Sequence, residues 1–188
     1  MSADASASSS TPAAAQLKTT RSGIPQAPFI SDVVAHLGGA DEDAGPHLEK
    51  FAEAMQKYKV MEEKTFRKRE ALEEKIPDIR KTLQMVQYLK SKKEAEESVN
   101  TQFELNETLY AHAEIEPLDS VNLWLGANVM LSYPLDEALE LLQRNLDGAQ
   151  SSLENVMDDL DFLRDQITTM EVNTARVHNW DVKRRREM

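Results

Sequence analysis

The sequence has no cysteine among its 188 residues, only six glycines and seven prolines, and 6% aromatic residues. The missing cysteines exclude disulfides, thiolate metal sites and cysteine nucleophiles. Few turn-forming residues and a charged fraction of 29% argue against a β-sandwich or a compact α/β enzyme and favour long helices. The longest apolar stretch, residues 123–131, is too short for a membrane span, which needs about 18 residues.

Positive charge is also scarce. The chain has 22 Lys and Arg against 33 Asp and Glu, which gives a net charge of -11. Such a surface repels phosphate backbones and anionic lipid at long range, so we expect neither nucleic acid nor a membrane as a partner. Residues 1–16 have no basic start and no apolar core, so we expect no secretory signal and a cytoplasmic location, with a nuclear pool left open.

Motifs for catalysis and metal binding are missing as well. No HExxH, GxxxxGKS or GxGxxG pattern occurs, and the acidic residues of the stretch 158–161 have the pattern of a solvated helix face. None of the four histidines has the spacing of metal ligands: His36, His47, His112 and His178. We therefore expect no enzymatic activity, no metal and no cofactor.

What the sequence does contain is two long stretches in which apolar residues recur at alternating steps of three and four. This spacing predicts two helices with coiled-coil seams. The first seam, within residues 48–93, is polar in the middle at Glu62 and Arg69. Pro77 predicts a kink in this helix, because an internal proline removes a main-chain hydrogen bond. The second seam, within residues 139–177, is more regular.

Between the two helices the apolar period changes from 3.5 to 2, which predicts two β-hairpins over residues 101–133. Residues 126–128 give the turn signal of the second hairpin. Both strand faces carry bulk, since Trp124 alternates with Leu123, and hairpins with open edges are marginal alone. We therefore predict assembly with other chains through the apolar strand residues: Leu109, Ile115, Val121, Leu123, Trp124, Leu125, Val129, Met130 and Leu131.

The predicted fold class is α+β and mainly α, a long antiparallel helical hairpin joined by two β-hairpins. Ser31 is the expected cap of a short helix that ends at Gly38 and Gly39. The predicted segments are a disordered tail (1–28), a short docking helix and linker (29–47), an N-terminal coiled-coil helix (48–100), a β-hairpin assembly unit (101–133), a C-terminal coiled-coil helix (134–182) and a basic tail (183–188).

Four longer motifs carry a family resemblance. They are KIPDI (75–79), LWLGANVML (123–131), DLDFLRDQ (159–166) and EVNTARVHNWDVKRR (171–185). These motifs resemble the prefoldin family in its eukaryotic α-class, whose subunits have two hairpins where β-class subunits have one. The resemblance covers the chain from about residue 29 to its end.

The resemblance implies an ATP-independent chaperone, a hexamer in which the hairpins form an oligomeric β-barrel body and the coiled coils project from it. The implied partners are one further α-class and four β-class prefoldin subunits, the cytosolic group II chaperonin, and unfolded actin and tubulin. The alternative is a coiled-coil structural adaptor or tether without chaperone activity. That alternative shares every heptad but gives no reason for an apolar strand unit midway along the chain.

Antiparallel pairing outward from the hairpins places the polar Glu62 and Arg69 opposite apolar residues around 163–170. We expect these to be incompletely covered and to offer adaptable surface to a client, unless a local register shift lets Met61 and Phe66 fill the gap. The predicted client-binding residues of the distal coiled coil are Met55, Met61, Phe66, Leu163, Ile167, Met170, Val177 and Trp180. The predicted electrostatic contact with the chaperonin or a client is Lys183, Arg184, Arg185 and Arg186.

Overall fold

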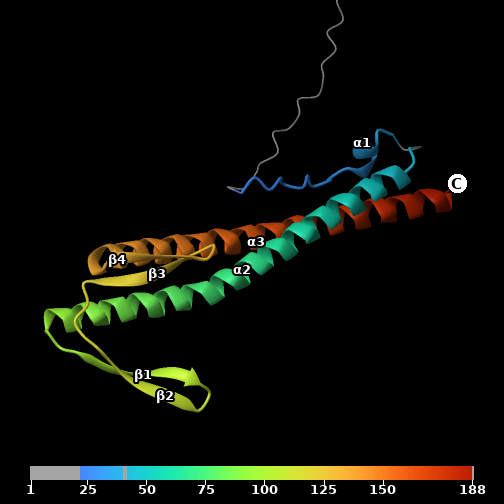
Figure 1. Ribbon diagram of the computed structural model, residues 1–188. Helices are drawn as coiled ribbons and strands as arrows, with labels where there is room; N and C mark the ends of the chain where they lie inside the picture. The colour runs from blue at the N-terminus through green and yellow to red at the C-terminus, as the bar shows by residue number, and fades with distance from the viewer. Residues whose placement is uncertain (1–21, 40–41, 188) are drawn as a thin grey trace, which may run out of the picture. The chain divides into compact units, whose positions relative to one another are not determined.

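The computed structural model describes residues 22–39 and 42–187 (Figure 1). In chain order the elements are α1 (Val33–Leu37), α2 (Gly45–Glu94), β1 (Val99–Asn106), β2 (Leu109–Ile115), β3 (Ser120–Gly126), β4 (Val129–Pro134) and α3 (Leu135–Glu187). The chain forms two compact units, a terminal unit of Met1–Glu62 with Asp161–Met188 and a central unit of Glu63–Leu160. Helices α2 and α3 each contribute a segment to both units.

The two long helices are confirmed, and their ends differ from the prediction. Helix α2 ends at Glu94, so the predicted helix over 48–100 is too long at that end. Helix α3 continues to Glu187, so residues 183–187 are its last turns and not a separate tail. Basic side chains there complement the negative end of the helix dipole. The helix assignment of α2 continues through Pro77, and a kink at this residue stays a prediction.

The core of the central unit lies along the seam between α2 and α3. Leu83, Val86, Leu142 and Leu146 are all buried in one cluster, as the heptads predict. Each such side chain contributes about 1.5 to 3 kcal/mol by leaving water. The helices run antiparallel in this unit, because residues late in α2 face residues early in α3.

Two ion pairs lie at the hairpin end of the central unit. Lys90 Nζ lies 2.7 Å from Asp136 Oδ1, and Lys93 Nζ lies 2.7 Å from Asp119 Oδ1. The hydrogen bond from Lys90 lowers the pKa of Asp136, and the one from Lys93 lowers the pKa of Asp119. Because both carboxylates are solvent-exposed, each pair adds little to the free energy of unfolding. The pairs connect α2 to the start of α3 and to the residue before β3.

The strands form two separate antiparallel hairpins, β1–β2 and β3–β4. In the second hairpin Leu123 pairs with Leu131 and Trp124 with Met130, and the turn lies at residues 126–128 as predicted. Ala127 and Asn128 both have positive φ, 47° and 63°. Positive φ at both central residues matches the right-handed twist of the flanking strands, which is why this turn closes the hairpin.

The prediction of a disordered tail over 1–28 is wrong for its last residues. Ile24 and Ala27 are 8% and 5% exposed and belong to a cluster with Tyr58, Leu163 and Met170 in the terminal unit. The Ser- and Ala-rich residues that precede Ile24 make it difficult to recognise the three-residue spacing of Ile24 and Ala27 in the sequence. Residues 1–21, the rest of the predicted tail, lie outside the described residues.

The short docking helix is confirmed as α1, with two corrections. Its cap is Asp32 rather than Ser31: the Asp32 carboxylate accepts hydrogen bonds from the amides of Val34 and Ala35. Gly38 ends the helix in the left-handed conformation, as expected. The helix buries Leu37, whereas Val34 is 39% exposed.

No helix in the described part of the chain is both long and apolar enough to span a bilayer. Among residues 22–39 and 42–187, no three His, Asp or Glu side chains are grouped as metal ligands would be.

The partly exposed His36 of α1 contacts two rings of α2, and its pKa leads us to expect pH-dependent docking. Its ring stacks on Phe51, with centroids 5.7 Å apart, and meets the edge of His47 at 5.4 Å. Burial, and next the charge of His47, lower the pKa of His36 below its ordinary value of 6.5. Undocked α1 therefore takes up a proton more readily than docked α1, so docking is strongest above pH 6.5 and weakens as the pH falls below it.

We predict that the protection of the α1 amides, corrected for intrinsic exchange, falls between about pH 7.5 and about pH 5.5. The change His36→Phe keeps the ring contact and removes the titration, so it should abolish most of this fall. The control His112→Phe alters an exposed histidine of β2 and should retain it. Equal pH dependence in all three proteins would contradict the assignment to His36.

Candidate functional site

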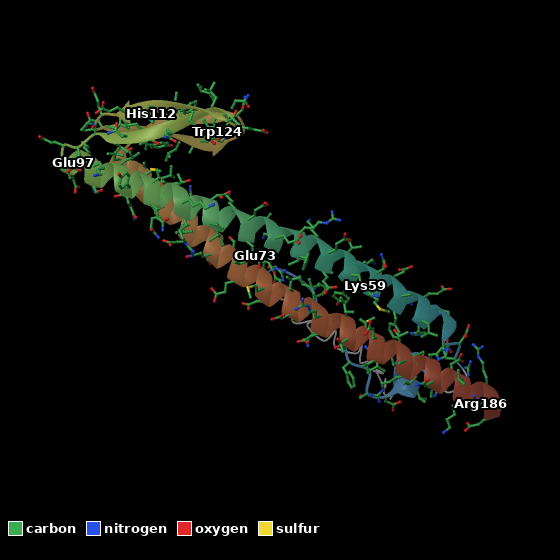
Figure 2. All side chains as sticks on the ribbon, turned by 90° about the horizontal axis from the view of Figure 1, so that it is seen from below. Lys59, Glu73, Glu97, His112, Trp124 and Arg186 are labelled. Atoms are coloured by element: carbon green, nitrogen blue, oxygen red, sulfur yellow. The ribbon has the colours of Figure 1, made fainter. Side chains whose placement is uncertain are left out.

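The hairpin β3–β4 has one face on the helices and one face in solvent. Val121, Leu123 and Tyr133 pack against the core of the central unit. On the opposite face the paired Trp124 and Met130 are 61% and 52% exposed. Figure 2 labels Trp124 on this hairpin. An exposed Trp–Met pair on a two-stranded sheet is the kind of surface that a further strand or another chain covers.

The hairpin β1–β2 is exposed to a similar degree. Phe103, Leu105, Leu109 and Tyr110 are between 51% and 64% exposed, and none belongs to a buried cluster of the described residues. Of these four, only Leu109 is among the predicted interface residues. Alternation along β1 could have identified Phe103 and Leu105, since the apolar residues of this strand recur at a period of two.

Both hairpins also leave main-chain groups without a strand partner. Among the described residues each hairpin pairs only within itself, so each strand has one outer edge with unpaired N–H and C=O groups. Of the predicted interface, Leu109, Trp124, Leu125, Val129, Met130 and Leu131 are exposed, Ile115 and Val121 are half-buried, and Leu123 is buried. Leu123 therefore anchors its hairpin to the helices, and the outward-facing residues are the ones available to another chain.

An open groove of about 720 Å³ lies in the central unit, where the tip of β3–β4 meets the two helices. Leu72 and Ile79 of α2, Leu141 of α3, and Leu125 of β3 contribute to its lining. The groove extends the exposed apolar surface of the hairpin onto the helices, so the candidate assembly surface includes helix residues that the strand pattern could not predict.

The predicted client-binding residues divide into three groups. Leu163, Met170 and Val177 are buried, Met55, Met61, Ile167 and Trp180 are half-buried, and Phe66 is 38% exposed. The expectation that Leu163 and Met170 are incompletely covered is therefore wrong in the single chain. Trp180, which the sequence left without a core, packs against the cluster of Ile30, Ala44 and Val177.

The cover over these residues is the segment of residues 24–30, which was assigned to the tail and linker. Gln166 and Asn173, which the sequence analysis did not single out, bind its main chain and are 5% and 0% exposed. One signal could have identified them: both are amides, seven residues apart, directly beside the apolar seam of the second helix. A repeat of buried amides at the heptad spacing indicates a row of hydrogen-bond partners.

The four basic residues near the end of α3 do not act alike. Arg184 and Arg185 both pair with Asp181, which is buried, at 3.1 and 2.7 Å. Arg184 also donates to the main-chain oxygen of Glu42. Lys183 and Arg186 are exposed. Asp181 thus engages Arg184 and Arg185 within the terminal unit, although the Arg185 side chain is still 67% exposed. Lys183 lies 3.8 Å from Glu187 of the same helix, so Arg184 is the least accessible of the four cations.

The family model for prefoldin subunits matches residues 58–180, which include most of both long helices and both hairpins. The matched region thus contains the two-helix, two-hairpin arrangement and the exposed strands described above. The chain belongs to the prefoldin family of co-chaperone subunits.

Individual relatives give the same result. The chain is 51% identical over 181 residues to prefoldin subunit 3 of Elsinoe fawcettii, covering 96% of this chain and 91% of that one. It is 49% identical over 164 residues to prefoldin subunit 3 of Homo sapiens, covering 87% and 83%. The resemblance drawn from the four motifs is confirmed.

Among solved structures, a chain of the filamentous PFD from Methanocaldococcus jannaschii matches with a TM-score of 0.52 at 17% identity. The match covers 65% of this chain and 98% of that one. At this identity the likeness shows the fold alone, and it agrees with a mainly helical chain.

We predict that the double change Trp124→Ser and Met130→Ser prevents or weakens assembly with the other prefoldin subunits. It removes the largest exposed apolar pair of β3–β4 without touching the helix-facing Leu123. The matched control is Met157→Ser, which removes a 51% exposed methionine from α3. Native mass after mixing with the partner subunits should show loss of assembly for the double variant only. Full assembly of the double variant would contradict the assigned surface.

Proposed function

We propose that the chain is one subunit of a hexameric, ATP-independent prefoldin that captures unfolded proteins and passes them to the cytosolic group II chaperonin. Actin and tubulin are the proposed clients, and a cytoplasmic location follows from them. The observation that carries the proposal is the family match, which extends over both long helices and both hairpins.

The hairpins supply the proposed assembly step. Their outer edges and exposed apolar faces are suited to pairing with strands of one further α-class and four β-class subunits, which would close a β-barrel body. Closing the barrel satisfies the main-chain groups that each hairpin leaves unpaired. The partner subunits therefore complete the fold of the central unit as well as the complex.

The terminal unit supplies the proposed client contact. Met55, Met61, Ile167 and Trp180 are half-buried there, and methionine side chains adapt to partners of varied shape. Leu163, Met170 and Val177 lie beneath residues 24–30 and extend this apolar surface when that segment moves. Phe66 lies in the central unit, with the guanidinium of Arg69 over its ring at 4.6 Å.

We predict that the triple change Met61→Ser, Ile167→Ser and Trp180→Ser lowers the affinity of the assembled complex for denatured actin by roughly tenfold, because a few half-buried apolar contacts together contribute somewhat more than 1 kcal/mol. The control Val60→Ser removes an apolar residue of the same unit that is already 55% exposed. Suppression of actin aggregation is the measurement, with native mass to verify assembly. Undiminished capture by the intact triple-variant complex would exclude these residues as the client surface, and no capture by the wild-type complex would favour a structural adaptor.

The basic end of α3 supplies a proposed electrostatic contact with the chaperonin or with acidic clients. Since Asp181 engages Arg184 and Arg185, we expect Lys183 and Arg186 to contribute most.

We predict that Lys183→Ala with Arg186→Ala weakens binding of the assembled complex to the chaperonin and reduces its salt dependence, because exposed charges are screened by salt. The control Lys59→Ala removes an exposed cation elsewhere in the terminal unit. Binding measured at low and high salt decides the point. An affinity that neither the double variant nor salt changes would rule this contact out.

A further inference from the structure

Residues 24–30 run across the terminal unit without helical structure and bury every third side chain. Ile24, Ala27 and Ile30 are 8%, 5% and 4% exposed, whereas Pro25 and Pro28 between them are exposed. A period of three is that of an extended, polyproline-type chain, which presents one residue in three to a given surface. The segment therefore docks as an extended peptide, seen in blue beside α2 and α3 in Figure 1.

The surface of α2 and α3 in the terminal unit that lies beneath residues 24–30, called the peptide groove below and distinct from the groove of the central unit, binds this segment through its main chain. The amide of Ala27 donates to Gln166 Oε1 at 2.8 Å, and the amide of Ile30 donates to Asn173 Oδ1 at 3.0 Å. Asn173 Nδ2 donates in turn to the carbonyl oxygen of Pro28 at 2.7 Å. Main-chain groups are the same in every sequence, so these bonds place few demands on the side chains of the bound segment.

Two spacings agree along the groove. Gln166 and Asn173 are seven residues apart on α3, a rise of about 10.5 Å. The two amides that they accept are three residues apart on an extended chain, a distance of about 9 to 10 Å. One heptad of helix therefore corresponds to one three-residue repeat of peptide, and the amide side chains lie in register with it.

Two further main-chain contacts hold the ends of the segment. Tyr58 donates its hydroxyl to the carbonyl oxygen of Pro25 at 3.0 Å, and Arg176 donates to that of Ser31 at 2.9 Å. The side chains of Ile24 and Ala27 enter the cluster with Leu163 and Met170, while Ile30 enters the cluster with Val177. The floor of the groove is thus made from residues of the proposed client surface.

We propose that this groove is a binding site for extended segments of unfolded chains that carry an apolar residue at every third position, and that residues 24–30 are an internal occupant which such a segment displaces. The inference rests on the proposed function, because the client is an unfolded protein. Gln166 and Asn173 would recognise the client through its main chain, as they recognise residues 24–30. Residues 24–30 would then compete with the client for the same site.

The test uses the assembled complex and a fluorescent peptide with the sequence of residues 22–32, SGIPQAPFISD. The double change Ile24→Asp and Ile30→Asp in the full chain disfavours the internal occupant, because it places carboxylates against apolar clusters. We expect the peptide to bind this opened complex at least about tenfold more tightly than the wild-type complex, because residues 24–30 occupy the groove in a smaller fraction of the complexes. A peptide with the same composition and its apolar residues placed consecutively should bind weakly to both.

The main-chain recognition is tested by Asn173→Ala in the opened complex, with Thr168→Ala as the control. Thr168 is exposed on the same helix and bonds only to the carbonyl oxygen of Arg164. Peptide affinity should fall severalfold for Asn173→Ala alone. Equal affinity of the two variants, or equal binding of the ordered and rearranged peptides, would overturn the proposal.

A measurement without variants covers the case in which the opened chain fails to assemble. In the wild-type complex the amides of Ala27 and Ile30 should be protected from exchange, and excess peptide should remove this protection. Peptide binding that leaves them protected would overturn the proposal. If the wild-type complex suppresses aggregation of denatured actin while the peptide tests fail, the proposed function stands without this site. If it does not suppress aggregation and the peptide still binds, the groove stands without that function.

Discussion

A two-stranded sheet cannot pair all of its own main chain, and this constraint determines how the central unit is used. Each hairpin leaves two outer edges, and the exposed faces carry Phe103, Trp124 and Met130. Water can solvate the main-chain groups at the strand edges, but the apolar faces are stabilised only when another surface covers them. The helices cover one face of β3–β4 through Leu123, and we propose that other prefoldin subunits cover the remaining strand surface.

In the terminal unit, main-chain groups are paired and apolar side chains are covered in a different way. There side chains pair main-chain groups of an extended segment, above all the buried Asn173, which both donates and accepts. The apolar groups beneath it, such as Met170 and Val177, are covered by the chain itself. In the single chain, one unit therefore leaves apolar surface exposed, and the other covers its apolar surface with a segment held by a few hydrogen bonds.

The sequence predicts what depends on local periodicity. The heptads identify the seam around Leu142 and Leu146, and the alternation of residues with the turn at 126–128 identifies the hairpin β3–β4. The packing of residues 24–30 was missed, because its three-residue repeat is short and follows a low-complexity stretch. The burial of Leu163 could not be predicted from the heptads, because the residues that cover it, Ile24 and Ala27, are distant in sequence.

The central claim is that the strands of this subunit are completed by other subunits. Amide exchange of β1 to β4, measured for the isolated chain and for the assembled complex, tests it most directly. The account predicts strand amides that exchange near their intrinsic rates in the isolated chain and slow markedly on assembly. Strands equally well protected in the isolated chain would contradict it.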